Sequence, residues 1–307
     1  MTVSLDVQFT DSVSLSPGEH QAVKALTARC ADYDGFEPGL HFDTHLNADR
    51  SMPAWRLAWA HGKAPQRPVG ADDRRGSILV GAARVFAPTR REAEISACVD
   101  PVYRHQGVCR SLHDGLVEVL KAAGTESILL ACNAALPSAQ AIASCFGAMM
   151  DHTEYRMVLP AEGLAAAKAP DTVRLTPVSS SSLAEYVKLA AAVFGDEDRE
   201  WKEFAKAMLD DPEREQFMVH APEGVTGTVS IGREGTGFMI NGLGVVPELR
   251  GRGLGGAILD SCLFVLARRS ATHAALEVDA DNAPARALYR SRGFLDQGCT
   301  NYWRVQT

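Results

Sequence analysis

The sequence predicts a protein of the α/β (α+β) class that holds two copies of one domain. Its 307 residues suit two domains of about 150 residues each, and strands alternate with amphipathic helices in both halves. A segment near residue 104 repeats near residue 250 with a constant offset of 146 residues. The matched positions are Pro101 and Pro247, Arg104 and Arg250, Gly107 and Gly253, and Gly147 and Gly293. One spacing that serves four positions indicates an internal duplication.

The two copies show the same elements in the same order. In each copy an apolar strand ends at a proline and an amphipathic helix follows. A short apolar strand and a short helix that ends in glycine complete the pattern. The predicted strands are 94–99 and 127–132 in the first copy, and 240–246 and 274–278 in the second, where 225–231 is a further strand. The predicted helices carry apolar stripes from Val108 to Leu120 and from Leu254 to Leu266, with two more helices at 182–194 and 201–209.

An alanine- and proline-rich segment, 160–171, separates the two copies. The pattern of elements starts again after it, so we expect this segment to be a linker. The predicted domains are therefore residues 1–160 and residues 171–307.

Charge and composition exclude several classes of protein. The net charge of −7 argues against a nucleic-acid or anionic-membrane partner, because phosphate contact needs a basic surface. No apolar run approaches the ~20 residues that cross a bilayer, and the N-terminal segment lacks the features of a signal peptide. The seven cysteines form no CxxC pair and are expected to be reduced thiols in a cytoplasmic protein. The oligomeric state stays open.

One short pattern offers potential metal ligands. His41, Asp43 and His45 alternate, so a strand would carry all three on one face. Structural zinc takes four ligands, and no fourth is evident. We therefore expect no metal.

The strongest chemical feature is a glycine-rich turn between a strand and a helix, Arg250-Gly251-Arg252-Gly253-Leu254-Gly255-Gly256. Such a turn leaves several backbone N–H groups unpaired at a helix start, where the helix dipole favours anions. Glycine removes the Cβ that would keep an anion away, and the two arginines add positive charge. We expect a cradle for a pyrophosphate. A tight turn with solvated arginines is the plainer alternative.

A nicotinamide dinucleotide is a second candidate for this cradle. Gly251, Gly253 and Gly256 satisfy the Gly-x-Gly-x-x-Gly fingerprint, and Glu277 and Asp279 lie at the expected distance after it. However, four residues separate the turn from its strand, and too few residues follow Asp279 for further βαβ units. The first copy also lacks the three-glycine pattern. These observations disfavour the dinucleotide.

Two motifs in the second copy resemble the GCN5-related N-acetyltransferase (GNAT) family. They are Arg250-x-x-Gly253-x-Gly255 after a strand, and Asn282 followed by Leu288-Tyr289-x-x-x-Gly293-Phe294. The first copy matches more weakly, through Arg104-x-x-Gly107-x-Cys109. The resemblance implies a tandem GNAT fold, with two mixed, mostly antiparallel sheets flanked by helices, an arrangement similar to that of mycothiol synthase.

The resemblance also implies acetyl-CoA as cosubstrate, with its pyrophosphate on the turn and its pantetheine arm between two splayed strands. Gly242 and Gly244 suit a bulge or a close approach there. The implied binding residues are Leu243, Gly244, Val245, Arg250, Gly251, Arg252, Gly253, Leu254, Gly255, Gly256 and Asn282, with Val99, Arg104, Gly107 and Val108 in the first copy. Asn282 is equally suited to cap a helix.

By the same resemblance, Tyr289 is the general acid that protonates the departing thiolate, although it also suits a core position. Many relatives carry a glutamate base on the preceding strand, where this chain has Met239, Ile240 and Asn241. Glu277 and Asp279 are the candidate substitutes that act through water, and loss of the acceptor's proton to solvent is the alternative.

The first copy departs from the motifs, and we expect it to have reduced or absent catalysis. Cys109 replaces a small residue and narrows the cradle, and Ala143 stands at the position of Tyr289. The sequence therefore predicts acetyl transfer from acetyl-CoA to a primary amine of a small molecule or peptide, by direct attack in a ternary complex. Mycothiol-synthase-like acetylation of a cysteinyl pseudodisaccharide and non-catalytic binding of acyl-CoA are the alternatives.

Overall fold

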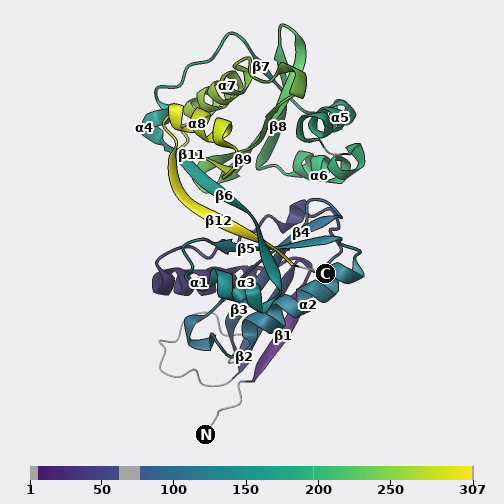
Figure 1. The fold of residues 1–307 in the computed structure, drawn as a ribbon, viewed down its shortest axis with the longest axis vertical. Coiled ribbons are helices and arrows are strands. Elements are labelled where there is room, and N and C mark those ends of the chain that lie inside the picture. Colours follow the sequence, from purple (N-terminus) through teal and green to yellow (C-terminus); the bar gives the residue numbers. More distant parts are fainter. Residues whose placement is uncertain (1–5, 62–76, 196, 306–307) are drawn as a thin grey trace. The chain divides into compact units, whose positions relative to one another are not determined.

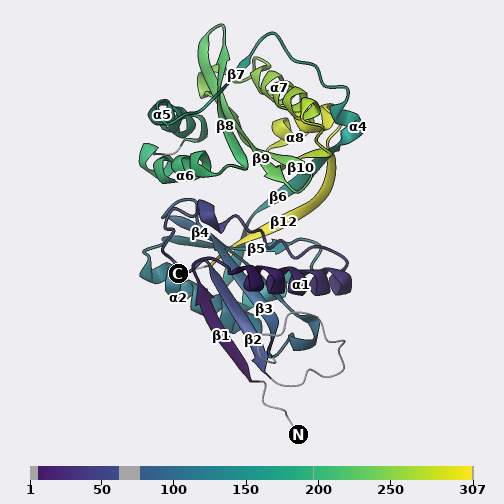
Figure 2. The same ribbon diagram turned by 180° about the vertical axis from the view of Figure 1, so that it is seen from behind.

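The computed structural model describes residues 6–61, 77–195 and 197–305, and the side chain of residue 200 is also not described. Contacts within the chain divide it into two units. Unit 1 comprises Met1–Asp151 with Asn301–Thr307, and unit 2 comprises His152–Thr300 (Figures 1 and 2). The last residues of the chain group with unit 1, so the units are not two consecutive halves.

Unit 1 is a sheet with helices on both faces. Its strands lie in the order β1-β2-β3-β4-β5, and all neighbours are antiparallel except β4 and β5. Helix α1 packs on one face, while α2 packs on the other (Figures 1 and 2). The elements are β1 (Val7–Ser12), α1 (Pro17–Asp34), η1 (Thr44–Leu46), β2 (Trp55–His61), β3 (Ser77–Phe86), β4 (Glu92–Val99), η2 (Pro101–Tyr103), α2 (Val108–Ala122), β5 (Ser127–Asn133) and α3 (Ala139–Cys145).

Unit 2 repeats this plan. Its strands lie in the order β6-β11-β10-β9-β8-β7, and the described neighbours are antiparallel except β10 and β11. Helices α5 and α6 lie on one side of this sheet, and α7 and α8 on the other (Figure 1). The elements are β6 (Ala148–Pro160), α4 (Ala161–Leu164), β7 (Arg174–Pro177), α5 (Leu183–Phe194), α6 (Asp198–Asp210), β8 (Arg214–Ala221), β9 (Gly224–Glu234), β10 (Gly237–Val245), η3 (Pro247–Leu249), α7 (Leu254–Arg268), β11 (His273–Asp279), α8 (Ala283–Ser291) and β12 (Leu295–Val305). The first residues of β6 and the last of β12 belong to unit 1.

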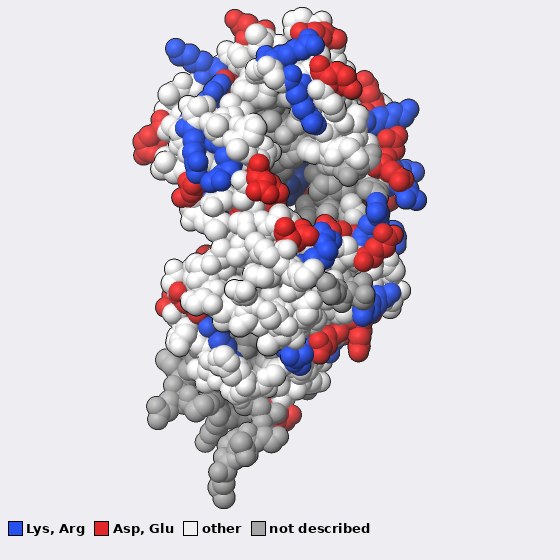
Figure 3. Space-filling view, viewed as in Figure 1, with Lys and Arg blue, Asp and Glu red and all other residues white. Residues whose placement is uncertain are grey.

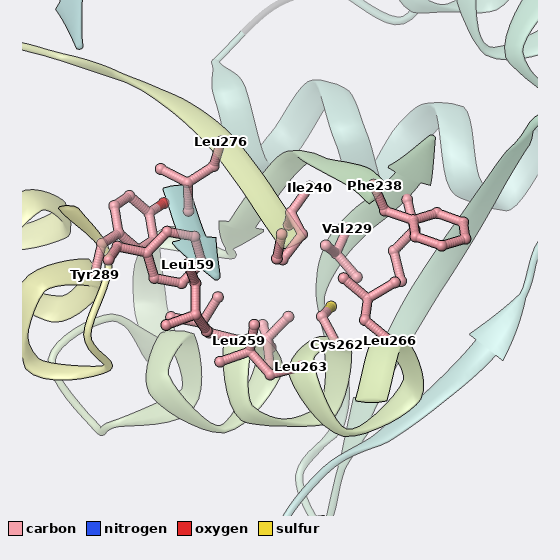
Figure 4. Close-up of a cluster of buried hydrophobic side chains, with 14 of the residues drawn as sticks. Leu159, Val229, Phe238, Ile240, Leu259, Cys262, Leu263, Leu266, Leu276 and Tyr289 are labelled. Atoms are coloured by element: carbon pink, nitrogen blue, oxygen red, sulfur yellow. The ribbon is translucent and has the colours of Figure 1, made fainter. Parts of the chain in front are cut away.

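The core of unit 2 lies between α7 and the sheet (Figure 4). Helix α7 presents Leu254, Ile258, Cys262 and Leu266 at helical spacing, and all four are buried. Alternate residues of the strands face them, because successive side chains of a strand point to opposite faces. Removing a buried leucine side chain from such a core costs about 2–5 kcal/mol, so this packing fixes where the turn before α7 lies.

The α/β class with mostly antiparallel sheets is confirmed, and the predicted elements are present with slightly different ends. The strand predicted at 240–246 is β10, and the helix predicted at 201–209 is α6. The segment predicted as a linker begins with α4, whose Leu164 is buried in the core of unit 2. Its alanines favour a helix, and its leucine supplies the apolar contact.

The predicted strand face of His41, Asp43 and His45 is wrong, because residues 44–46 form the 3₁₀ helix η1. Asp43 pairs with Arg84, with an Oδ1–Nη1 distance of 2.9 Å. Among the described residues, no group of three His, Cys, Asp or Glu side chains is placed to hold a metal.

Three further features concern the cysteines, the length of the apolar helices and the charges on the surface. All seven cysteines are free thiols. No described helix is long and apolar enough to span a membrane. The face shown in Figure 3 carries basic and acidic side chains next to one another, which is an ordinary mixed surface.

Candidate functional site

The glycine-rich turn of unit 2 leaves a run of backbone N–H groups without partners. Arg250 donates its N–H to the carbonyl of Pro247 (3.3 Å), and Ala257 donates to the carbonyl of Gly253 (3.2 Å). Between them, the N–H groups of residues 251–256 have no acceptor within the described part of the chain. A series of unpaired donors at a helix start is suited to bind an anion.

Two of the glycines keep this turn open. Gly251 and Gly253 have φ of +76° and +81°, a left-handed conformation that favours glycine. A Cβ built on either residue meets nothing within 4 Å, so the space beside the turn is open. Gly256 serves packing, since its Cβ would lie 3.1 Å from Nη2 of Arg292 and 3.5 Å from Cδ1 of Leu288 on α8.

Arg250 fastens the turn to two neighbouring elements. Its guanidinium donates through Nε to the carbonyl of Val245 (3.0 Å) and through Nη2 to the carbonyl of Val193 (2.6 Å). Val245 ends β10, and Val193 lies in the last turn of α5. The side chain therefore sets the position of the turn, in addition to any charge it contributes. Arg252 is exposed, and its Nη2 lies 3.4 Å from the carbonyl of Glu248.

The two parallel strands beside the turn separate soon after they meet. β10 and β11 pair only at Phe238 with Ala274 and at Met239 with Ala275, although β10 continues to Val245. A bulge shifts the register of β10 against β9 between residues 241 and 244. The left-handed φ of Gly242, +56°, accommodates this bulge, as expected from the sequence.

A backbone donor of β10, the N–H of Val245, faces the gap that this separation leaves. Val246 donates its N–H to the carbonyl of Thr226 on β9 (2.9 Å). Successive residues of a strand direct their backbone groups to opposite sides, so the N–H of Val245 is directed away from β9, toward β11. Residues 243–245 thus form an edge to which an extended chain can add.

Tyr289 is a buried residue on α8 at one end of the core. Its ring centroid lies 6.0 Å from that of Phe294, and the residue is 7% exposed. In Figure 4 its hydroxyl points toward Leu276 of β11. Burial raises the pKa of Tyr289 above its usual value, so the hydroxyl holds its proton at neutral pH.

The other predicted site residues have structural bonds of their own. Asn282 caps α8, since its Oδ1 accepts the N–H of Ala285 (3.2 Å). Asp279 accepts the N–H of Asp281 (2.7 Å) in a turn. Glu277 is exposed on β11, on the face opposite to the core residues Leu276 and Val278. None of the described contacts marks Glu277 or Asp279 as a base.

Unit 1 has a turn similar to that of unit 2, but it lacks the bulge in the strand before it. Gly107 has a φ of +83°, and the N–H groups of residues 105–110 have no described acceptor. Arg104 donates to the carbonyl of Val99 (3.0 Å) and forms an ion pair with Asp34 (2.6 Å). β4 pairs with β3 without a register shift, and with β5 over four residues. In unit 1 the two parallel strands therefore pair over more residues than the two pairs of β10 and β11, and no bulge interrupts β4.

The expectation that Cys109 narrows the first cradle is not supported, because Cys109 packs against the core cluster of unit 1. Burial raises the pKa of its thiol. Ala143, at the position of Tyr289, is fully buried. The missing bulge and the missing tyrosine, rather than Cys109, distinguish this unit.

Sequence reasoning missed the surroundings of Gly244. A Cβ on Gly244 would lie 2.2 Å from Cγ1 of Val193 and 3.3 Å from Cζ of Phe194, so this glycine lets α5 approach β10. The sequence named Asn241 only as a position without a glutamate, yet its buried Nδ2 has no hydrogen-bond partner in the described chain. A polar residue inside an apolar strand was the available signal.

Comparisons with known proteins agree with this geometry. The model of the Acetyltransferase (GNAT) family matches residues 30–147 and 183–294. A protein of Clavibacter sepedonicus named mycothiol acetyltransferase is 30% identical over 92% of this chain and 91% of its own length. A protein of Thermobifida fusca with the same name is 27% identical over 95% and 96%.

Solved structures share the fold. A GCN5-related N-acetyltransferase from Sphaerobacter thermophilus has a TM-score of 0.72 at 19% identity, over 97% of this chain and 95% of that chain. A tandem GNAT protein from the clavulanic acid biosynthesis pathway has a TM-score of 0.67 at 18% identity, over 97% and 98%. At these identities the likeness concerns the fold alone.

Proposed function

This chain belongs to the GNAT family of acetyltransferases, and on that premise we propose that unit 2 moves an acetyl group from acetyl-CoA to a primary amine by direct attack in a ternary complex. The family makes the chain an acyltransferase with acetyl-CoA as acetyl donor. The acceptor, the roles of single residues and the place of the chemistry are our proposals. Unit 1 would have reduced or absent catalysis.

The single observation that carries the proposal is the combination of the unpaired N–H groups of residues 251–256 with the gap between β10 and β11. A diphosphate needs several donors, and a pantetheine arm needs a free strand edge beside them. The turn supplies the first, and residues 243–245 supply the second. These residues fit acetyl-CoA, which supplies a thioester activated for attack by an amine.

Two parts of the chain would assist the transfer. A backbone N–H of residues 243–245 would hold the thioester oxygen, a type of donor worth about 10²–10³ in rate. Tyr289 would give its proton to the departing sulfur, and its raised pKa keeps that proton available. Asn282 would bind the pantetheine arm through its amide nitrogen, while its oxygen caps α8.

For the acceptor, we propose the cysteinyl pseudodisaccharide from which mycothiol is made. The support is that relatives matching this chain almost end to end are named mycothiol acetyltransferase. Met239 lies in the stretch where many family members carry a glutamate base. We therefore propose that the acceptor amine reaches the site already neutral, or loses its proton to solvent.

The test is turnover of acetyl-CoA with a panel of primary amines that includes the cysteinyl pseudodisaccharide. Because that acceptor carries its own thiol, the acetylated product is measured by mass spectrometry, and fragmentation locates the acetyl group on nitrogen. We expect N-acetylation with the pseudodisaccharide as the preferred amine. Binding of CoA without turnover of any amine would instead favour a non-catalytic acyl-CoA-binding protein.

A further inference from the structure

A row of three polar side chains crosses the sheet of unit 2 beside the bulge of β10. Register places Gln216 of β8 opposite Ser230 of β9, and Ser230 opposite Asn241 of β10. Gln216 is 3% and Ser230 is 2% exposed. Three polar residues at one level of three neighbouring strands form a polar band where an apolar core is the rule.

This row lies on the side of the sheet that carries α5 and α6. The neighbouring residues Phe217, Val229 and Ile240 belong to the core under α7, so the row faces the other way. Gln216 confirms the direction, because its Nε2 donates to the carbonyl of Ala205 on α6 (3.0 Å).

Two atoms of the row are buried without a partner in the described chain. They are Nδ2 of Asn241, a donor, and Oε1 of Gln216, an acceptor. The hydroxyl of Ser230 has a partner, since it donates to the backbone carbonyl of Asn241 (3.4 Å). Buried polar groups in folded proteins are nearly always paired, and an exception calls for an explanation such as a missing ligand.

Asn241 also lies close to the proposed point of transfer. It is two residues before Leu243, the start of the strand edge proposed to hold the thioester, and it immediately precedes the bulge. On the same side, Phe194 is 42% exposed and stacks on Trp201 with ring centroids 5.2 Å apart. Phe194 approaches β10 at Gly244, where a built Cβ would lie 3.3 Å from its Cζ, so this aromatic pair lies three residues along the strand from Asn241. Small-molecule sites are typically lined by aromatic side chains with a few placed polar groups.

We infer that Asn241 is an acceptor-binding residue, whose Nδ2 donates a hydrogen bond to a carbonyl oxygen adjacent to the amine that is acetylated. The inference rests on the proposed function. The cysteinyl acceptor proposed above is an α-aminoacyl compound, and Asn241 would favour this class over plain alkyl amines, because only the former place a carbonyl beside the amine. An amide side chain takes up no proton at neutral pH, so Asn241 orients the amine and is not its base.

The experiment compares two matched acceptors, an aminoacyl amide and the same amine with the carbonyl replaced by methylene. Wild type and Asn241→Leu are assayed with saturating acetyl-CoA. We expect Asn241→Leu to lower kcat/KM for the carbonyl-bearing amine by about 10- to 100-fold, the loss of one buried hydrogen bond. The KM for acetyl-CoA and the rate with the methylene analogue stay unchanged.

Met239→Leu is the control variant, because Met239 shares the strand and the face of Asn241 and has no donor. Met239→Leu should leave the ratio of the two acceptors' kcat/KM values as in wild type. Thermal unfolding separates recognition from structure: Asn241→Leu removes a donor that is unpaired in the free protein, so its Tm should equal or exceed that of wild type. If the side chain of Asn241 made a bond that stabilises the fold, its replacement by leucine would lower the Tm.

Equilibrium binding keeps the inference separate from the proposed function. Both acceptors are titrated into wild type and Asn241→Leu in the presence of CoA, where no transfer occurs. Weaker binding of the carbonyl-bearing amine to the variant alone supports the inference even if wild type turns over no amine. The inference would be overturned if Asn241→Leu left the ratio of the two acceptors' kcat/KM values and the ratio of their affinities as in wild type. Such a result includes an equal loss for both acceptors.

Discussion

Substitution of Gly253 by valine tests the cradle most sharply. Gly253 has a φ of +81°, and a Cβ there meets nothing within 4 Å. The left-handed conformation costs a non-glycine residue about 1–2 kcal/mol, and a branched one more. A domain has about 5–15 kcal/mol of stability, so Gly253→Val should stay folded with a Tm lower by several degrees.

The effect on CoA should be much larger. The new side chain occupies the open space beside the unpaired N–H groups of residues 251–256. Each hydrogen bond to a charged oxygen contributes about 1.5–3 kcal/mol. Loss of two such bonds weakens CoA binding by about 10²- to 10⁴-fold. Calorimetric titration measures the affinity for CoA in wild type and in the variant. Pantetheine, which lacks the diphosphate, is the control ligand, and its affinity should not change.

Unit 1 offers a matched control. Gly107 begins α2 with a φ of +83°, and a Cβ there also meets nothing within 4 Å. Gly107→Val should lower the Tm by a similar amount and leave the proposed CoA site of unit 2 unchanged. If Gly253→Val binds CoA as wild type does, or loses pantetheine equally, the diphosphate is not held at this turn.

Three further results are expected. Tyr289→Phe should lower kcat by about 10²- to 10⁴-fold with unchanged CoA affinity; an equal loss of affinity would indicate a packing role instead. Burial raises the pKa of the Cys262 thiol to about 12, above the unfolded value of about 8.5. The unfolded chain therefore binds fewer protons between these pH values, and stability falls as pH rises through this window. Urea titrations at pH 7 and pH 10 measure the free energy of unfolding, which should fall less between these pH values in Cys262→Val than in wild type. An equal fall in both proteins would show that this thiol is not the cause of the pH dependence. Calorimetry with CoA should show one tight site per chain, and two equal sites would contradict reduced function of unit 1.

The sequence predicted most of the architecture because local signals repeat. Pro247 after β10 and Gly253 before α7 recur at one offset in unit 1, as Pro101 and Gly107, so the strand, turn and helix could be placed before any contact was known. The bulge at Gly242 was also foreseen, since a glycine inside an apolar strand indicates an irregular backbone. These features depend on a few neighbouring residues.

The features that the sequence missed depend on long-range contacts. The guanidinium of Arg250 is bound to the carbonyl of Val193, 57 residues away, and no local pattern predicts such a pair. The grouping of residues 301–307 with unit 1 needs the whole fold. Asn241 could be noticed in the sequence as a polar residue in an apolar strand, but its alignment with Gln216 and Ser230, which come from two other strands, needs the register of the sheet.

The most direct test of the account is an NMR titration of the ¹⁵N-labelled chain with CoA. The account predicts that the backbone N–H resonances of residues 251–256 shift and become protected from hydrogen exchange, followed by those of residues 243–245. If CoA binds and these N–H groups neither shift nor gain protection, the diphosphate lies elsewhere and the account is wrong.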